Sequence, residues 1–342
     1  VFDLRMLGQD LGMSFDLENL PLAFVDLDQS ASSVELRRRI TSSDDFIDGG
    51  TIDEGDAVPH LIAGDVVAVV VIERGFERHL RRGDRAAVQI LVDGADNNTA
   101  TQTRAKVETM VRVFGYDMAA RGRLSGIAPI EARTWTRFNP EGRSAIFLVP
   151  GVTAYVLAMI AVLLTALTVA REWERGSMAQ LFATPVGRLE IVLGKLLPYL
   201  VLGSLAVLLV LAVGMWVFDM PFRGSPGALA VLAILFIAGM LGQGLLISVL
   251  TRNQMVSTQA AALSSMLPSL LLSGFIFPVQ NMPTVLQWVS HIVPARYFVA
   301  GLRGVLLRGN GFAELWPDMV MLLAFVVVMV VVSTVRFRRT IA

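Results

Sequence analysis

Long uncharged stretches in the second half of the sequence constrain its fold more than any other feature. No Asp, Glu, Lys or Arg occurs between residues 144 and 170. A helix needs about 20 apolar residues to cross the roughly 30 Å hydrocarbon core of a bilayer. Helices of soluble proteins rarely stay uncharged for so long. We therefore expect five membrane-spanning helices, at residues 144–170, 196–218, 226–250, 255–279 and about 318–336.

Charged residues divide the chain into two unlike parts. Residues 1–143 contain 40 of the 58 Asp, Glu, Lys and Arg residues, and acids slightly outnumber bases there. This composition is typical of a soluble domain, whereas residues 144–342 resemble a polytopic membrane domain. The sequence has no basic tract, which argues against nucleic acid as a partner. We expect two domains that meet near residue 143.

Short apolar segments alternate with helical patterns in residues 1–143. The expected strands are rich in Val, Ile and Ala and are bounded by Asp or Gly, and the expected helices show helical spacing or an N-cap such as Ser30. This alternation predicts a small α/β domain. The strands are expected at 20–28, 65–73 and 86–94, and the helices at 31–42, 75–82 and 97–120.

Basic residues predict the orientation of the spans. Arg336, Arg338 and Arg339 lie at and just after the end of the last span, which favours a cytoplasmic C-terminus. Five crossings then place residues 1–143 outside the cytoplasm, with 171–195 inside. An exported N-terminal domain needs a preceding segment for its export, so we expect a further span ahead of Val1 and six spans in the full chain.

Metal and cofactor chemistry has little support in the sequence. Cysteine is absent, and His60, His79 and His291 each stand alone. We expect no catalytic residues, no metal and no cofactor in this chain. The interiors of the expected spans hold no Asp, Glu, Lys or Arg, which argues against a proton-coupled transporter.

The connection REWERGSMAQLFATPVGR, residues 171–188, is too long and too charged for a simple turn. Met178, Leu181 and Phe182 lie at helical spacing and would form one apolar stripe. Gly176 allows a bend before this helix, and Pro185 ends it. A lipid-surface helix and a helix that binds a groove on a protein partner are both open interpretations. Balanced charge favours the protein partner, because lipid-surface helices are usually rich in Lys and Arg.

Several segments together resemble a known family. Residues 171–199, REWERGSMAQLFATPVGRLEIVLGKLLPY, resemble the cytoplasmic loop of type-2 ATP-binding-cassette (ABC) transporter permeases, with Ser177 and Phe182 in place of the usual Thr and Leu. The resemblance extends to the drug-efflux subgroup with a large extracytoplasmic domain. It covers LPLAFVDLDQS at 20–30, AAVQILVDGADNNTA at 86–100, FIFPVQNMP at 275–283, VPARYFVAGLRGVLLRG at 293–309 and the C-terminal end.

The resemblance implies the membrane subunit of an ATP-driven exporter, with a cytoplasmic coupling helix at about 171–185. The chain has no G-x-x-x-x-G-K-[ST] phosphate loop. The partner ATPase subunit would therefore bind ATP and magnesium. A second permease chain, in a homo- or heterodimer, and a periplasmic adaptor are further expected partners. The residues expected to couple to the ATPase are Arg171, Glu172, Glu174, Arg175, Gly176, Met178, Leu181, Phe182, Thr184 and Pro185.

The expected substrate is hydrophobic or amphiphilic and would leave through the inner membrane of a bacterial cell. Gln243, Gln259, Ser264 and Arg296 are candidates for the substrate path. Polar groups in spans usually form interhelical hydrogen bonds, and arginines near the membrane surface often extend to lipid headgroups. Arg296 belongs to an expected re-entrant or interfacial segment at about 284–309. The alternative function is a membrane-anchored interaction protein whose extracytoplasmic domain binds an envelope partner.

Overall fold

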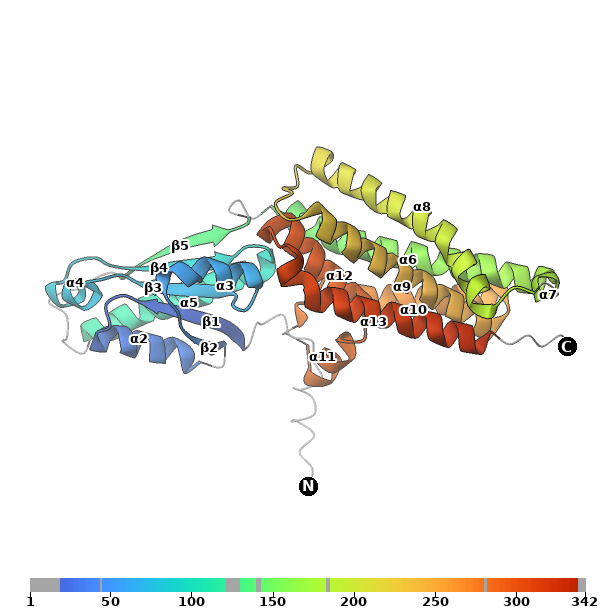
Figure 1. The fold of residues 1–342 in the computed structure, drawn as a ribbon. Coiled ribbons are helices and arrows are strands. Elements are labelled where there is room, and N and C mark those ends of the chain that lie inside the picture. Colours follow the sequence, from blue (N-terminus) through green and yellow to red (C-terminus); the bar gives the residue numbers. More distant parts are fainter. Residues whose placement is uncertain are drawn as a thin grey trace, which may run out of the picture. The chain divides into compact units, whose positions relative to one another are not determined.

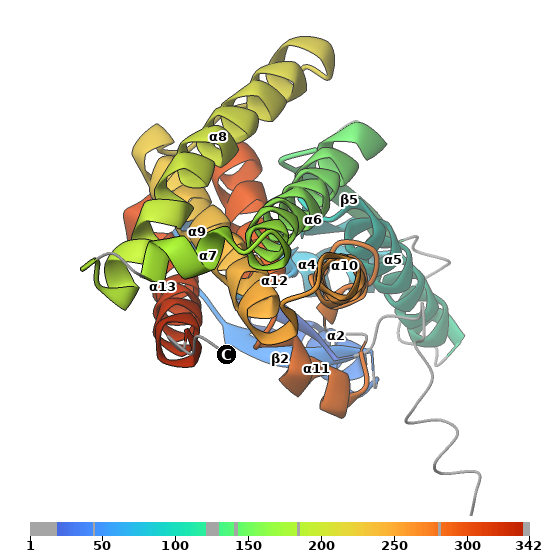
Figure 2. The ribbon, with the colours of Figure 1, turned by 90° about the vertical axis from the view of Figure 1, so that its right-hand side faces the viewer.

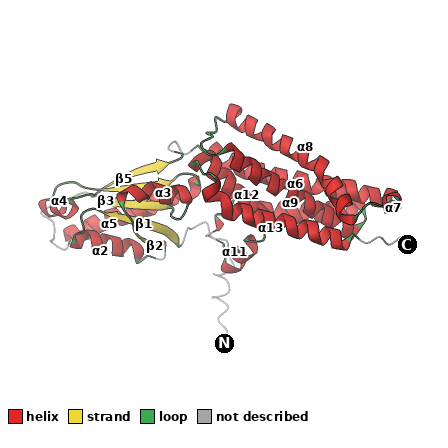
Figure 3. Cartoon of the chain, in the orientation of Figure 1, coloured by secondary structure: helices red, strands yellow, loops and turns green. Residues whose placement is uncertain are grey.

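The computed structural model describes residues 19–43, 45–120, 130–139, 143–182, 185–279 and 282–337, with the backbone alone at 97, 144, 145, 179 and 182. The chain divides into two compact units, Val1–Phe147 and Leu148–Ala342. The first contains strands and helices, and the second is helical (Figure 3). The division lies four residues beyond the boundary expected at 143.

The first unit alternates strands and helices (Figure 1). All three expected strands and all three expected helices are present, with ends that differ by at most three residues from their predicted positions. The elements are β1 (Leu20–Asp26), α2 (Ala31–Thr41), β2 (Phe46–Thr51), a 3-10 turn (Glu54–Asp56), α3 (Ala57–Ala63), β3 (Ala68–Ile72), α4 (Phe76–Arg82), β4 (Ala86–Asp93), α5 (Asn97–Ala120) and β5 (Ile130–Arg137).

The sequence analysis missed β2, β5 and α3. Strand β2 has the sequence FIDGGT, in which Phe46 alone is buried. Strand β5, IEARTWTR, alternates but carries polar side chains at most positions. Both are edge strands of the sheet, and an edge strand buries few side chains. The apolar signal that marks the central strands is therefore weak in these two.

The five strands form one mixed sheet in the order β2-β1-β3-β4-β5. Strand β1 pairs in parallel with β2 and β3, and β4 pairs in parallel with β5, but β3 and β4 are antiparallel. Alternate residues of β1, β3 and β4, such as Phe24, Val70 and Ile90, face the main core with α2, α4 and α5. Helix α3 packs against β3, and its Leu61 is fully buried. Helices on both faces thus bury the central strands.

The second unit is a bundle built around α9 (Pro226–Thr251), which contacts α8, α10, α12 and α13 (Figure 2). Among the described residues, four helices are long and apolar enough to cross a membrane, with mean hydropathy of 2.3 to 2.6. They are α6 (Ser144–Glu174), α8 (Arg188–Val217), α9 and α13 (Phe312–Arg336). Helices α8 and α13 each extend several residues before the expected spans. The shorter helices are α7 (Ser177–Phe182), α10 (Gln254–Leu271), α11 (Thr284–Ser290), α12 (Pro294–Arg303) and the π-helical turn Gly304–Arg308.

The expected fifth span, 255–279, corresponds to α10 and a non-helical segment after it. Helix α10 ends at Leu271, and residues 272–277 form bends. Seven of its 18 residues are Ser, Thr or Gln, which lowers its apolarity below that of the other four helices. The fifth crossing therefore stays a prediction.

Close helix contacts and aromatic stacking hold the bundle together. A Cβ on Gly244 of α9 would lie 2.1 Å from Thr165 Oγ1 and 2.3 Å from the Val162 carbonyl oxygen of α6, so only glycine fits this crossing. Thr165 Oγ1 also donates to the Leu241 carbonyl at 3.0 Å. Phe236 of α9 stacks on Phe298 of α12, with ring centroids 4.1 Å apart and planes 7° from parallel.

Candidate functional site

A sharp bend separates the end of α6 from the short helix α7. Gly176 lies between them with φ of +73°, in the left-handed region that favours glycine. Helix α6 already includes residues 171–174, so the coupling segment is an extension of a span, a bend and a six-residue helix, and not one helix over 171–185. The Glu190 carboxylate accepts a hydrogen bond from the Gly187 backbone N–H at 2.8 Å, which caps the start of α8.

Two acidic residues of the segment bind other helices of the same unit. Glu172 forms an ion pair with Lys195 of α8. Glu174 Oε1 accepts a hydrogen bond from the backbone N–H of Gln254, at the start of α10, at 2.7 Å. A carboxylate is favourable there, because the first N–H groups of a helix have no intrahelical partner and carry the positive end of its dipole. These contacts join the end of α6 to α8 and α10.

Trp173 makes two aromatic contacts at the same end of the bundle. The Arg252 guanidinium carbon, in the turn between α9 and α10, lies 4.6 Å from the centroid of its ring. The ring of Phe337, just beyond α13, lies at 5.9 Å between centroids. The sequence analysis did not propose these three residues as part of the site. An aromatic residue directly after a long apolar run is their only local signal, and the contacts join positions far apart in the sequence.

The expected apolar stripe does not face outward as a whole. Met178 is 1% exposed and packs inside this chain, whereas Leu181 is half-buried. The side chain of Phe182 and all of Thr184 lie outside the described residues, as do Arg338 and Arg339. Pro185 is exposed after α7.

Arg171 and Arg175 are exposed at the end of α6, next to the two acidic residues that bind α8 and α10. Glu174 is exposed as well, so the described segment carries both signs of charge on its surface. Its two carboxylates already bind α8 and α10, which the balance of charges in the sequence does not show.

Two of the substrate-path candidates are in contact. Gln243 Nε2 of α9 donates to Ser264 Oγ of α10 at 3.2 Å, an interhelical bond of the kind expected for polar groups in spans. Gln259 is exposed on α10. Arg296 of α12 instead donates to Ser290 Oγ at 2.5 Å and lies 3.2 Å from His291 Nδ1. Both contacts come from Nη1 of Arg296 and lie within the segment near 284–309.

Apolar helices joined by a charged, bent connection, together with a separate α/β unit, define a polytopic membrane protein with an attached mixed-sheet domain. The profile of the ABC-2 family transporter proteins matches residues 7–335, so the chain belongs to this family. The family resemblance expected from residues 171–199 is therefore confirmed.

Among similar proteins, the probable multidrug ABC transporter permease YbhS of Escherichia coli is 41% identical over 61% of this chain and 55% of its own length. The permease YbhR of the same organism is 26% identical over 95% of this chain and 88% of its own length. The chain thus spans about half the length of YbhS. A solved domain of a putative ABC type-2 transporter from Thermotoga maritima covers 34% of this chain and 84% of its own, at 16% identity and a TM-score of 0.29.

Proposed function

We propose that this chain is the permease subunit of an ATP-driven exporter whose ATP is hydrolysed by a separate ABC ATPase subunit. The observation that carries the proposal is the anchored bend after α6. Arg171 and Arg175 are exposed there, while Glu172 and Glu174 bind α8 and α10. A partner that binds the exposed side of this segment would therefore pull on several membrane helices together.

Motion would pass from the bend into the bundle through specific contacts. Glu172 contacts α8 and Glu174 contacts α10. Trp173 contacts the α9–α10 turn and the end of α13. Packed interfaces shift between discrete arrangements and do not deform continuously. Closure of the ATPase subunits would thus switch the helices as a group and open a path for a hydrophobic or amphiphilic substrate.

The bend supports the proposed orientation of the chain in a bacterial inner membrane. Contacts to Trp173 bring Arg252 and Phe337 to the end of the bundle that holds the bend, and Arg336 precedes Phe337. Arg171, Arg175 and Arg188 belong to the same connection. Basic residues concentrate on the cytoplasmic side of membrane proteins. This end would accordingly face the cytoplasm, with the α/β unit outside.

A dimer with a second permease chain is part of the proposal. Gln259 and Ser264 are exposed on α10. Polar side chains are unfavourable against lipid, so this face of α10 suits a second chain.

A contact with a periplasmic adaptor is also part of the proposal. Trp135, 63% exposed on edge strand β5, would contact the adaptor on the extracytoplasmic side.

Reversal of the exposed charges tests the proposal. The full chain is co-expressed with a separately encoded ABC ATPase from the same genome and reconstituted in vesicles. We expect the ATPase to co-purify with the chain, and the double substitution Arg171→Glu and Arg175→Glu to remove most of the co-purification and of the coupled ATP hydrolysis. The control is Arg74→Glu with Arg78→Glu, an equal charge change at exposed positions of the α/β unit.

If the ATPase never accompanies the wild-type chain, the exporter function is wrong, and the interaction-protein alternative stands. Capture of envelope proteins through the α/β unit then becomes the deciding measurement, with Trp135→Ala as the variant. If both charge-reversal pairs lower co-purification equally, the loss reflects charge in general, and the bend is not the ATPase contact.

A further inference from the structure

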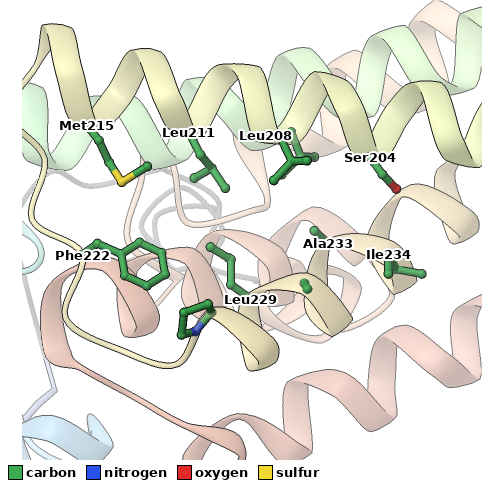
Figure 4. Close-up of a pocket in the computed structure, with 11 residues that line it drawn as sticks. Ser204, Leu208, Leu211, Met215, Phe222, Leu229, Ala233 and Ile234 are labelled. Carbon is green, nitrogen blue, oxygen red and sulfur yellow. The ribbon is translucent and has the colours of Figure 1, made fainter.

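An apolar groove of about 510 Å³ lies between α8 and α9 (Figure 4). Met215, Leu211 and Leu208 of α8 point toward Phe222, Leu229 and Ile234 on the opposite side. The volume lies within the range of small-ligand pockets, about 300–1,000 Å³. Both walls are candidate membrane spans, and the groove is open along its side. It is thus in contact with the hydrocarbon of the bilayer.

The side chains that line the groove favour a ligand made of hydrocarbon alone. Ser204 is the one polar side chain among the described residues that line the groove, and its hydroxyl donates to the Leu200 carbonyl at 2.8 Å. A ligand with a polar group inside the groove would leave that group without a hydrogen bond, which is unfavourable. If the groove stayed empty, the side chains along both of its walls would lose dispersion contacts. An alkyl chain satisfies both conditions.

The length of the groove matches one leaflet of the bilayer. From Ser204 to Met215 along α8 the helix rises about 16 Å, and half of the hydrocarbon core is about 15 Å thick. Trp216, 86% exposed, follows Met215 at the end of α8. Exposed tryptophan is typical of the boundary between hydrocarbon and headgroups. The groove therefore runs from this boundary to the middle of the membrane.

A basic residue stands at the boundary end. Arg223 is exposed in the connection between α8 and α9, next to Phe222 of the groove, and one of its nitrogens, Nη1, donates to the Leu307 carbonyl at 3.3 Å. This hydrogen bond ties the guanidinium to the turn at Leu307, and Arg223 follows directly on Phe222 at the end of the groove. Arginine binds phosphate with charge-assisted hydrogen bonds. The apolar groove and the cation thus match the two parts of a phospholipid.

We propose that the α8–α9 groove binds one acyl chain of a phospholipid from the leaflet at the 218–225 end, with the lipid phosphate at Arg223. The site is separate from the bend that receives the ATPase and does not depend on the proposed function. A bound chain would fill the space beside α8, which otherwise contacts the bundle mainly through α9.

Photoactivatable lipids test the site. The full chain is reconstituted in bilayers of phosphatidylethanolamine and phosphatidylglycerol, with a trace of phosphatidylglycerol that carries a diazirine either at the end of one acyl chain or near its glycerol. Cross-linked residues are located by mass spectrometry. We expect the chain-end probe to label the deep end, around Ser204 and Ile234, and the glycerol-side probe to label Met215 and Phe222. Labelling there should exceed that of the exposed α13 residues Val327 and Val331.

Matched substitutions separate the site from general lipid contact. Ala230→Phe fills the groove from α9, and groove labelling should fall to the level of Val327. Leu209→Phe adds an aromatic ring on the exposed surface of α8 outside the groove and should leave labelling unchanged. Arg223→Gln should reduce labelling by the phosphatidylglycerol probe but affect a phosphatidylethanolamine probe less, because the latter headgroup has no net charge.

Four results would overturn the proposal or its assignment of the phosphate. The groove is ordinary lipid-facing surface if α8, α9 and α13 are labelled equally, or if Ala230→Phe has no effect. It is a protein interface if the wild-type groove cross-links to a second permease chain and not to lipid. The assignment of the phosphate to Arg223 is wrong if Arg223→Gln leaves both probes unchanged.

Discussion

Glu174, the last residue of α6, accepts a hydrogen bond of 2.7 Å from the backbone N–H of Gln254, the first residue of α10. The two residues are 80 positions apart in the sequence. The bond lies one residue from the Trp173–Arg252 contact and two from the Glu172–Lys195 ion pair. The end of α6 is thus the point where the coupling segment meets several helices of the bundle.

Replacement of Glu174 by Ala should uncouple the ATPase from the membrane helices. The change removes the acceptor at the start of α10 and should cost about 1 kcal/mol of stability, as loss of a helix cap does. We expect the ATPase to bind the variant normally but substrate to stimulate ATP hydrolysis less. Glu174→Gln keeps an acceptor oxygen and should retain more stimulation.

The matched control is Glu314→Ala. Glu314 accepts a hydrogen bond from the Gly311 backbone N–H, also at 2.7 Å, at the start of α13. A similar loss of thermal stability is expected there, with substrate stimulation intact. Equal loss of stimulation in both variants would mean that Glu174 acts through stability alone.

Gly176→Ala should destabilise the chain, because Gly176 has a positive φ. The left-handed conformation costs a residue with a Cβ about 1–2 kcal/mol, although open space surrounds the position. Gly194→Ala is the control, since a Cβ there also meets nothing within 4 Å, but the residue lies inside helix α8. Alanine is favoured over glycine in a helix by about 1 kcal/mol. The midpoint of thermal unfolding in detergent should thus fall for Gly176→Ala and rise for Gly194→Ala. Shifts of the same sign in both variants would contradict the left-handed backbone at Gly176.

Gly244→Ala should disrupt the crossing of α6 and α9. The added methyl group would lie within 2.3 Å of the Val162 carbonyl oxygen, which belongs to the backbone and moves little. Overpacking of this kind costs about 1–3 kcal/mol. Gly227→Ala in the same helix meets the Phe312 ring at 3.5 Å, an ordinary contact, and should be tolerated. Thermal unfolding and size-exclusion chromatography compare the two variants; equal behaviour would show that the crossing has room for a side chain.

The α/β unit should lose stability at low pH through Asp28. Burial by itself raises the pKa of the Asp28 carboxyl, but hydrogen bonds from the backbone N–H of Glu77, from Ser30 and from the Gly75 backbone outweigh it and lower this pKa below the ordinary value of 3.8. The unfolded chain therefore takes up a proton at higher pH than the folded one. The stabilising contribution is complete above pH 3.8 and is lost as the pH falls through the folded pKa.

Hydrogen exchange of the full chain, corrected for intrinsic rates, measures this effect. Below pH 3.8 we expect protection of residues 75–82 to fall, because Asp28 holds the start of α4 through the Gly75 and Glu77 N–H groups. Asp28→Asn should lower protection already at neutral pH. Asp53→Asn, at an exposed acid without a side-chain cap bond, should not. Unchanged protection in Asp28→Asn would show that this carboxylate does not hold α4.

Local patterns were sufficient for much of the fold. The central strands bury both faces, so their Val- and Ile-rich segments were visible in the sequence, as in DVVAVVVIE around β3. Four of the expected spans are long apolar helices because bilayer thickness sets a length that composition alone reveals. The edge strands β2 and β5 bury little and left no such pattern.

The candidate site was predictable in place but not in geometry. The sequence by itself determined that residues 171–188 break between two apolar helices, because Gly176 and Pro185 restrict the backbone locally. Only the tertiary structure decided which of these side chains are buried, which bind other helices and which stay exposed. Met178 is buried, Glu172 and Glu174 bind α8 and α10, and Arg171 and Arg175 remain exposed.

The contacts of Trp173 with Arg252 and Phe337 and the lining of the α8–α9 groove likewise join residues that are far apart in the sequence. Periodicity reports which face of a helix is apolar, but not which helix covers it. That choice follows from close contacts such as the Gly244 crossing, where a single missing side chain sets how near two helices approach.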